Sequence, residues 1–307
     1  MKMKVVMNPV SGGGASIRVW KQVEQVLIEN KIEYDCESTD TNKSAKSITS
    51  ESIKKGFKWI LGIGGDGTLS NIVNGFFENG KLIRNDVVFS PIPAGRGNDF
   101  VKTVNVPRDP KKAIKQILAG ETKSIDLISV DYTTNDNKRE HYYCLNLADF
   151  GMGGEVVYRV NRSRLSNILG GKGVFLLYSL ICLFTYKNKR IHLKISDYEK
   201  ISEKSRIVVC ANGEFAGGGM WFAPKAKLDD GKFDFLAIQN VSIFETLLKF
   251  GKLYRGKVSE DAKVISKQIS ELTAESDEDV YIDVDGENMG KLPAKFKIIP
   301  KVIKIKC

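Results

Sequence analysis

The sequence predicts an α/β + β protein: an N-terminal doubly wound α/β nucleotide-binding domain followed by a C-terminal antiparallel β-sandwich domain. Up to about residue 125, short β-branched runs alternate with helical patterns. This alternation is typical of a mostly parallel sheet covered on both faces. Beyond that point short strands dominate. A chain of 307 residues is also long enough for two ordinary domains, each with its own core.

The first part divides into strands and helices in strict alternation. Strands are expected at residues 3–9 ("MKVVMNP"), 34–38 ("YDCES"), 59–64 ("WILGIG") and 87–93 ("VVFSPIP"). Helices are expected at residues 15–30, near 43–55 and after Thr68. Parallel sheets bind ligands at the carboxyl ends of their strands, so the loops that follow these four runs are the first place to look for a site.

The second part consists mainly of strands. They are expected at residues 125–133, 141–147, 190–196, 205–212, 232–238 and 280–287, with a hairpin at "TTNDNKRE". The tail "KFKIIPKVIKIKC" alternates Lys with Ile or Val, which favours a half-buried strand over a basic stripe for nucleic acid or membrane. We therefore divide the chain into residues 1–125, 126–290, and 291–307 as a tail strand that returns toward the first domain.

Composition narrows the function classes. The 42% hydrophobic and 27% charged content is that of a soluble globular protein, and the net charge of +10 favours an anionic partner. Charge alone does not choose among nucleotide, nucleic acid and acidic lipid. Five scattered cysteines without a CxxC spacing suggest neither a disulfide framework nor a zinc site, which indicates a reduced cytosol. The first residues lack a signal-peptide apolar region.

One apolar stretch, "VFLLYSLICLFTY" at residues 174–186, stands out. It is shorter than the roughly 20 residues that a membrane-spanning helix needs. We expect a buried helix, and a helix lying at a lipid interface is the alternative.

Three glycine patterns compete as phosphate sites. "GIGGDG" fits the dinucleotide pattern GxGxxG, but Asp66 lies where a pyrophosphate would press on the backbone. "GFFENGKL" fits GxxxxGK, but Leu82 replaces the Ser or Thr that should hold magnesium, so we interpret it as a decoy. "GGDGT" offers bare amides and the Thr68 hydroxyl at a helix N-terminus, where Asp66 can face a metal-bound water on the phosphate. A tight turn with Asp66 as N-cap is the structural alternative.

Further motifs accompany "GGDGT" in a fixed order. They are "NPVSGGG" (8–14), "PAGRGNDF" (93–100), "IDL" (125–127), "NLADFGMGGEV" (146–156), "ANGEFAGGGMWFAPKAKLDDGKFD" (211–234) and "DVDGE" (283–287). Together they resemble the diacylglycerol kinase catalytic family, and specifically its bacterial soluble lipid kinases, almost from end to end. The family is distantly related to NAD kinases and 6-phosphofructokinases.

The resemblance implies site residues. The nucleotide-binding positions it implies are Asn8, Ser11, Gly12, Gly64, Gly65, Asp66, Gly67, Thr68, Gly95 and Asn98. The family commonly has Thr or Ser where this chain has Arg96, although a guanidinium can also hold phosphate. The implied catalytic residues are Asp285, as general base on the lipid hydroxyl, with Glu287 and Asp66. From the residues alone, "DVDGEN" is equally a hairpin turn.

The resemblance also implies metal positions. Asp66, Asp99 and Asp126 correspond to a water-linked magnesium network. The Asp230 carboxylate with the carbonyls of Lys227 and Lys232 corresponds to a structural magnesium site, and oxygen donors suit that ion. An ordinary Asp-Asp-Gly turn is the alternative for "KLDDGK". We assign His141 and His192, which lie in no motif, to structural positions.

The function implied is an ATP- and Mg²⁺-dependent lipid kinase that phosphorylates a hydroxyl of diacylglycerol or a related lipid. We expect it to be cytoplasmic and peripheral at the inner face of an anionic membrane, to bind no nucleic acid, and to be free to pair as a homodimer through edge strands. One alternative is an NAD kinase-like enzyme, although that family lacks the NPxSGG turn and the AGGGMxxAP stretch. Another is a non-catalytic lipid-binding regulatory protein, which has no chemical need of the acidic residues.

Overall fold

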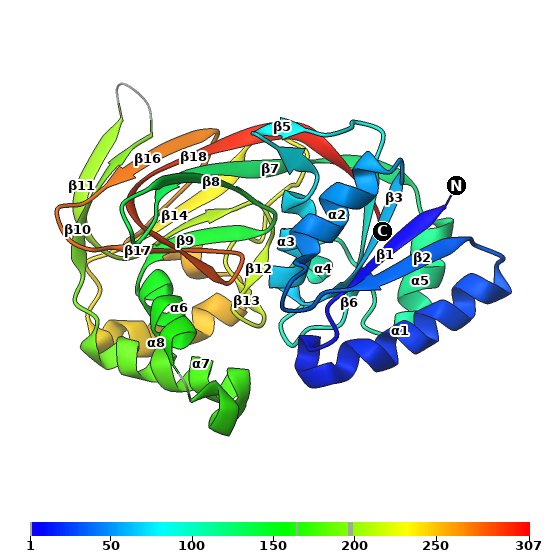
Figure 1. Ribbon diagram of the computed structural model, residues 1–307. Helices are drawn as coiled ribbons and strands as arrows, with labels where there is room; N and C mark the ends of the chain where they lie inside the picture. The colour runs from blue at the N-terminus through cyan, green and yellow to red at the C-terminus, as the bar shows by residue number, and fades with distance from the viewer. Residues whose placement is uncertain (1, 164, 196–198) are drawn as a thin grey trace.

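The computed structural model describes residues 2–163, 165–195 and 199–307. The first half is built on four parallel strands in the order β2-β1-β3-β6 (Figure 1). Their bounds are β1 Met3–Met7, β2 Tyr34–Ser38, β3 Trp59–Gly64 and β6 Val88–Pro93, as expected. Strands β1 and β3 are buried along their whole length, and their residues are apolar except Lys4, whose buried amine pairs with Asp35 and Glu37.

Helices cover both faces of these strands. Helix α1 (Ser11–Glu29) contacts α5 (Pro110–Ala119), and α2 (Ala45–Lys54) contacts α3 (Asp66–Asn74) on the opposite side (Figure 1). A short helix α4 (Asp99–Thr103) follows β6. The start of α1 is not regular, because the glycines at 12–14 have positive φ, so regular helix begins at Ala15 as predicted.

The glycine pattern "GFFENGKL" is a decoy, as predicted. Its residues form the short hairpin of β4 (Phe77–Glu78) and β5 (Lys81–Leu82). Phe77 is buried and stacks on Tyr143, with ring centroids 3.7 Å apart. Paired strands with packed aromatic rings leave no ring of bare amides for a phosphate.

The second half is a β-sandwich with mostly antiparallel strands. Its strands are β7 (Thr122–Thr133), β8 (Arg139–Cys144), β9 (Leu147–Gly151), β10 (Lys189–Lys194), β11 (Lys200–Ala211), β14 (Phe233–Gln239), β15 (Val264–Ile269), β16 (Glu271–Glu275) and β17 (Tyr281–Val284). A two-stranded ribbon of β12 (Phe215–Ala216) and β13 (Met220–Trp221) lies apart from them. One expectation was wrong: residues 141–147 form two strands instead of one, with a break at Leu145 and Asn146.

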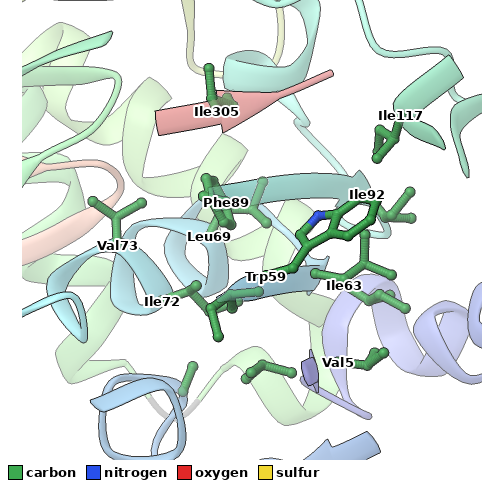
Figure 2. Packing of buried hydrophobic residues seen from close by; sticks show 14 of the residues in the cluster. Val5, Trp59, Ile63, Leu69, Ile72, Val73, Phe89, Ile92, Ile117 and Ile305 are labelled. Carbon is green, nitrogen blue, oxygen red and sulfur yellow. The ribbon is translucent and has the colours of Figure 1, made fainter. Parts of the chain in front are cut away.

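The tail returns to the first sheet. It is part of one long strand, β18 (Glu287–Lys306), which pairs with β17, β16 and β7 and then runs parallel to β6 through Ile305 and Phe89. Ile305 belongs to the core cluster of the first half, and Figure 2 shows it on the strand next to the one that carries Phe89. Phe296, Ile298 and Ile305 are buried while the lysines between them are exposed, which confirms the half-buried strand.

Three helices and one short 3₁₀ turn lie outside the strands of the second half. They are α6 (Met152–Arg162), α7 (Ser166–Thr185), α8 (Ile243–Tyr254) and η1 (Val258–Glu260). The prediction of a buried helix at residues 174–186 was wrong, because Leu176, Leu180 and Phe184 of α7 are 62%, 49% and 60% exposed. Within the described ranges, no helix has the length and apolar character needed to cross a membrane.

Candidate active site

Two glycine turns meet at the carboxyl ends of β1 and β3. Gly65 precedes α3 as its N-cap, and Thr68 lies in the first turn of that helix. The Asn8 side chain donates from Nδ2 to Thr68 Oγ1 at 3.2 Å, and the hydroxyl oxygens of Ser11 and Thr68 lie 3.3 Å apart. Two turns that are 60 residues apart in the chain therefore present one polar surface at a helix N-terminus.

A third turn, after β6, approaches the second so closely that only glycine fits. A Cβ atom added to Gly95 would lie 2.3 Å from the Cα of Gly65. In the first turn, a Cβ on Gly12 would lie 2.4 Å from the Ala94 carbonyl oxygen, and Gly12 itself has φ of 63°. The glycines thus let the three turns converge.

Asp66 links the second and third turns. Its Oδ1 accepts from the backbone N–H groups of Asp99 (2.8 Å) and Phe100 (3.1 Å). It therefore caps α4, not its own helix, and the alternative of Asp66 as a local N-cap is wrong. Burial raises the pKa of the Asp66 carboxyl above its usual range, against those two hydrogen bonds. In the described part of the chain its Oδ2 has no hydrogen-bond partner.

Asn98 and Asp99 shape the third turn from within. Asn98 has φ of 53°, accepts from the Gly95 N–H and donates to the Gly95 carbonyl, both at 2.9 Å. Asp99 accepts from Lys102 Nζ at 2.5 Å and from the Gly218 N–H at 2.7 Å. Both side chains are buried and bonded to the protein, so they position the turn and do not project freely from it.

Asp285 stands in the turn between β17 and β18, with φ of 53° and 7% exposure. Its carboxylate accepts from the backbone N–H groups of Leu145 (2.8 Å), Asn146 (2.9 Å) and Leu147 (3.0 Å), and from Ser70 Oγ (2.5 Å). The break between β8 and β9 points these amides at Asp285. Burial raises the pKa of Asp285, and the four hydrogen bonds oppose that rise.

Ser70 joins this carboxylate to the phosphate turns. It lies on α3, one turn beyond Gly67, and its Oγ is 3.2 Å from the hydroxyl of Tyr142. We did not identify Ser70 or Tyr142 from the sequence. Asp285 is 215 positions from Ser70, and no local pattern predicts such a contact.

Glu287 reaches the cleft from the other side of the same hairpin. Its Oε1 is 3.2 Å from the position of a Cβ on Gly67. Loss of hydrating water at the cleft wall raises the pKa of Glu287. A pocket of about 410 Å³ opens here, lined by Asn8, Ser11, Thr39, Ser44, Ala45, Gly65, Gly67, Thr68, Asn71 and Glu287. This volume suits a small ligand.

Three residues at the rim of this pocket were also missed from the sequence. Thr39 follows β2, and Ser44 and Ala45 begin α2. The sequence did contain a signal for this loop: ligands bind at the carboxyl edge of a parallel sheet, and residues 34–38 were predicted to be one of its strands. Only its edge position in the structure shows that this loop, too, faces the pocket.

The predicted metal residues fall in two places. Asp126 is completely buried, and its oxygens accept from the N–H groups of Lys301 and Gly231, each at 2.7 Å. It therefore ties the tail to the loop that holds Lys227, Asp230 and Lys232, away from the pocket lining. Asp230 is exposed and accepts from the Lys232 N–H at 3.0 Å.

A direct cage of carboxylates is not formed. Among the residues that the structure describes, no group of three or more His, Cys, Asp or Glu side chains is placed to hold a metal. Asp99 and Asp126 have both oxygens engaged, so Asp66 Oδ2 is the oxygen of the three aspartates that is free for a cation. The structural magnesium site stays a prediction, since it relies on two carbonyls and one carboxylate.

Arg96 lies where the third turn meets α7. A Cβ on Gly13 would be 3.4 Å from its Nη2, and a Cβ on Gly171 would be 3.3 Å from its Nη1. The guanidinium therefore lies between the first glycine turn and the kinked start of α7, and it forms no ion pair with any described residue. An exposed cation at this point can meet an anionic ligand.

A second buried carboxyl pair lies behind the catalytic hairpin. Asp149 of β9 and Asp283 of β17 are register partners on neighbouring strands. Burial raises the pKa of the Asp149 carboxyl to about 7. Burial and the neighbouring Asp149 charge raise the pKa of Asp283 well above its usual range. The pair therefore shares a proton at neutral pH.

This pair predicts a pH-dependent stability. The folded state holds a proton that the unfolded chain releases near pH 4, so its contribution is complete below about pH 4 and is lost as the pH rises through about 7. We expect Asp149→Asn, which can donate to Asp283, to raise the free energy of unfolding at about pH 8.5 by about 1–3 kcal/mol and to leave it nearly unchanged at about pH 4. Thermal unfolding of both proteins across this range measures the effect. Parallel curves for the two proteins would contradict it.

Comparison with known proteins agrees with this geometry. Residues 2–130 match the diacylglycerol kinase catalytic domain, and residues 147–307 match the YegS C-terminal NAD kinase beta sandwich-like domain. A diacylglycerol kinase of Staphylococcus haemolyticus (strain JCSC1435) is 27% identical over 303 residues, covering 98% of this chain and 87% of that protein. A diacylglycerol kinase of Staphylococcus saprophyticus subsp. saprophyticus is 26% identical over 305 residues, covering 99% and 94%.

The fold is shared with a solved structure. A diacylglycerol kinase from Bacillus anthracis str. Sterne superposes with a TM-score of 0.72 at 20% identity, covering 99% of this chain and 96% of that one. The two-part fold, the converging glycine turns and these matches define a kinase of the lipid kinase class. The chain belongs to the diacylglycerol kinase catalytic family, in the bacterial form with a YegS-type C-terminal domain.

Proposed function

We propose that this protein transfers the γ-phosphoryl group of ATP, with Mg²⁺, to a hydroxyl of diacylglycerol or a closely related lipid. One observation carries the proposal: the hairpin with Asp285 and Glu287 contacts the glycine turn at Gly64–Gly67 and the helix α3 that follows it. Asp285 accepts from Ser70 of that helix, and Glu287 lies beside Gly67. A carboxylate base and a phosphate site are thus adjacent, as phosphoryl transfer to an alcohol requires.

In this proposal the three turns bind the phosphates. The amides at Gly65 and Gly67, the hydroxyls of Ser11 and Thr68, and the N-terminus of α3 all favour an anion. The turns are held by internal bonds, such as those from Asn8 to Thr68 and from Asn98 to Gly95, so they need little rearrangement when the nucleotide binds. The loop with Thr39 and the start of α2 provide the remaining wall for the nucleoside.

The acceptor hydroxyl would lie toward Asp285 and Glu287. Asp285 removes the proton, while its three backbone amides keep the carboxylate in one orientation. Ser70 Oγ already donates to Asp285, so Ser70 can pass its own proton to Asp285 while it takes up the proton of the acceptor hydroxyl. Glu287, which is exposed in the cleft, orients the acceptor.

The residues fit a magnesium ion at one point. Asp66 Oδ2 is a free carboxylate oxygen next to the phosphate turns, and Mg²⁺ takes one or two carboxylates together with phosphate oxygens and water. The bound ion would neutralise charge on the phosphates during transfer. Asp99 supports Asp66 through the α4 backbone, because the Asp99 N–H donates to Asp66 Oδ1.

The first experiment is transfer of labelled γ-phosphate from ATP to a panel of lipids in mixed micelles, with NAD as an additional acceptor. We expect label on diacylglycerol or a related lipid, and loss of it without Mg²⁺. Label on NAD alone would support the NAD kinase-like alternative. Tight lipid binding without any transfer would support a non-catalytic regulatory role.

Arg96 provides a separate prediction for nucleotide binding. Because its guanidinium is unpaired beside the first glycine turn, we expect Arg96→Gln to raise the KM for ATP by about 5–20-fold, the worth of one charge-assisted hydrogen bond, with kcat within about twofold. Arg96→Lys, which keeps the charge, should recover part of the affinity. The matched control is Arg108→Gln, outside the glycine turns. An unchanged KM in Arg96→Gln would remove Arg96 from the phosphate site.

A further inference from the structure

Helices α7 and α8 each present a set of exposed apolar side chains. On α7, Leu176, Leu180 and Phe184 recur every fourth residue and so share one face of the helix. On α8, Phe244, Leu247 and Leu248 do the same at spacings of three and four. Phe244 is 70% exposed and Leu248 is 69% exposed. Clusters of large exposed apolar side chains mark interaction surfaces.

The two helices meet at one end. Asn188, just after α7, donates from Nδ2 to the Val241 carbonyl at 2.9 Å, immediately before the N-cap of α8. Arg206 holds the last turn of α7 by donating to the Leu183 carbonyl at 2.6 Å. Phe184 and Phe244 therefore belong to the same region, and Figure 1 shows both helices on the lower side of the second half, outside the strands.

Exposed basic residues follow both helices of this apolar face. Lys187 follows α7, and Arg255 and Lys257 follow α8; all three are exposed and form no ion pair within the described ranges. The acidic residue at the start of α8, Glu245, is neutralised by Lys263 at 2.6 Å. Apolar side chains with a basic border match a bilayer that contains anionic lipids, since the chains enter the headgroup layer and the cations meet lipid phosphates.

The other end of α7 reaches the active site. Gly170 breaks the helix with φ of 66°, and Gly171 lies beside the Arg96 guanidinium. One helix therefore joins the apolar face to the phosphate turns. A lipid substrate that leaves the bilayer at α7 would therefore be close to the cleft. A membrane-binding site far from the cleft would not bring the substrate there.

We propose that the face formed by Leu176, Leu180, Phe184, Phe244, Leu247 and Leu248 inserts shallowly into an anionic bilayer and holds the kinase over its lipid substrate. The proposal rests on the proposed lipid-kinase function for its purpose, but the surface and its occupant can be tested without ATP. Insertion of this face would leave no backbone N–H or C=O group of the helical segments without a hydrogen bond, because these groups are already paired within each helix.

The test is sedimentation of the full chain with phosphatidylcholine vesicles that contain phosphatidylglycerol. The variant carries Leu176→Gln with Leu248→Gln, which removes apolar surface and adds no charge. We expect its partition to vesicles to fall at least about tenfold, since each buried leucine is worth about that factor. The control is Ile28→Gln on α1, which is 62% exposed on the first half and should leave binding unchanged. Circular dichroism and the size-exclusion profile establish that each variant is folded.

Activity measurements separate this inference from the proposed function. The double variant should lose transfer to long-chain diacylglycerol in vesicles and keep transfer to a short-chain, monomeric diacylglycerol. Vesicle binding equal to that of the unaltered chain would overturn the docking face. A second result would also overturn it: the unaltered chain does not bind vesicles and is a dimer, whereas the double variant is a monomer. The face would then join two copies of the chain. Vesicle binding that is lost in the variant, in a protein with no lipid kinase activity, would support the face and overturn the function.

Discussion

Asp285→Asn is expected to lower kcat by about 10²–10⁴-fold, the usual contribution of a general base. The substitution replaces one carboxylate oxygen with an NH₂ group, which cannot accept a proton or a hydrogen bond. Both oxygens of Asp285 accept from backbone amides, so either orientation of the new side chain places a donor against a donor. We therefore also expect a loss of about 1–3 kcal/mol in the free energy of unfolding.

The measurement must separate chemistry from folding. Thermal unfolding and near-UV circular dichroism give the folded fraction, and kcat is then compared at a temperature where both proteins are folded. Asp279→Asn is the matched control, because Asp279 lies just before the same hairpin and its carboxylate is mostly exposed. A folded Asp285→Asn protein with full kcat would show that Asp285 only positions the loop at residues 145–147.

The pH profile provides an independent readout for the base. Burial is the main influence on Asp285 and raises its pKa, so its ionised form is lost at a higher pH than for an ordinary aspartate. Activity of the unaltered enzyme should therefore fall on the acidic side at a pH above about 4. If Asp285 is the base, the residual activity of Asp285→Asn should no longer follow that acidic limb.

Gly95→Ala is expected to reduce kcat/KM for ATP by about 100-fold, because a displacement of about 1 Å in a positioning element costs about that much. The added methyl would lie 2.3 Å from the Cα of Gly65, and that atom belongs to the backbone and cannot rotate away. The second and third glycine turns must therefore move apart, and the backbone N–H groups proposed to bind the phosphates no longer point at the same place. Gly95 does not have a positive φ, so the effect is steric overlap and not backbone strain.

Titration calorimetry with ATP, together with steady-state kinetics on a short-chain lipid, measures this effect. Gly251→Ala is a suitable control, since no atom lies within 4 Å of a Cβ added at that position in α8. Normal ATP binding by a folded Gly95→Ala protein would show that the convergence of the two turns is not needed for nucleotide binding.

Much of the first half can be read from the sequence because the relevant physics is local. An apolar run followed by glycine and a helical pattern predicts a strand, a phosphate turn and a helix N-terminus within about ten residues. The turns at Asn8, Gly64 and Gly95 were therefore predicted together with their strands. The structure adds the contacts of the individual side chains. Asn98 accepts a hydrogen bond from Gly95 within its own turn, and Asp66 caps a helix that begins 33 residues later.

Long-range contacts decided the rest of the candidate site. The break at Leu145 exists because three amides turn toward Asp285, which is 140 positions away, and no alternation of residues can reveal that. Thr39 and Asn71 both line the pocket only because β2 ends, and α3 begins, at the same edge of the sheet. Asp126, which the family resemblance grouped with Asp66, instead accepts hydrogen bonds from the loop at Gly231 and from the tail at Lys301.

By itself, the sequence determined the alternating α/β first half, the strand-rich second half, and the glycine turns with their acidic residues, since these depend on side-chain periodicity and backbone freedom over short stretches. Only the tertiary structure decided that Asp285 contacts α3, the helix of the phosphate turn, that the returning tail is the end of one strand that begins at Glu287, and that the apolar side of α7 faces outward. Those three outcomes depend on which distant surfaces cover one another, because burial is a property of the assembled chain.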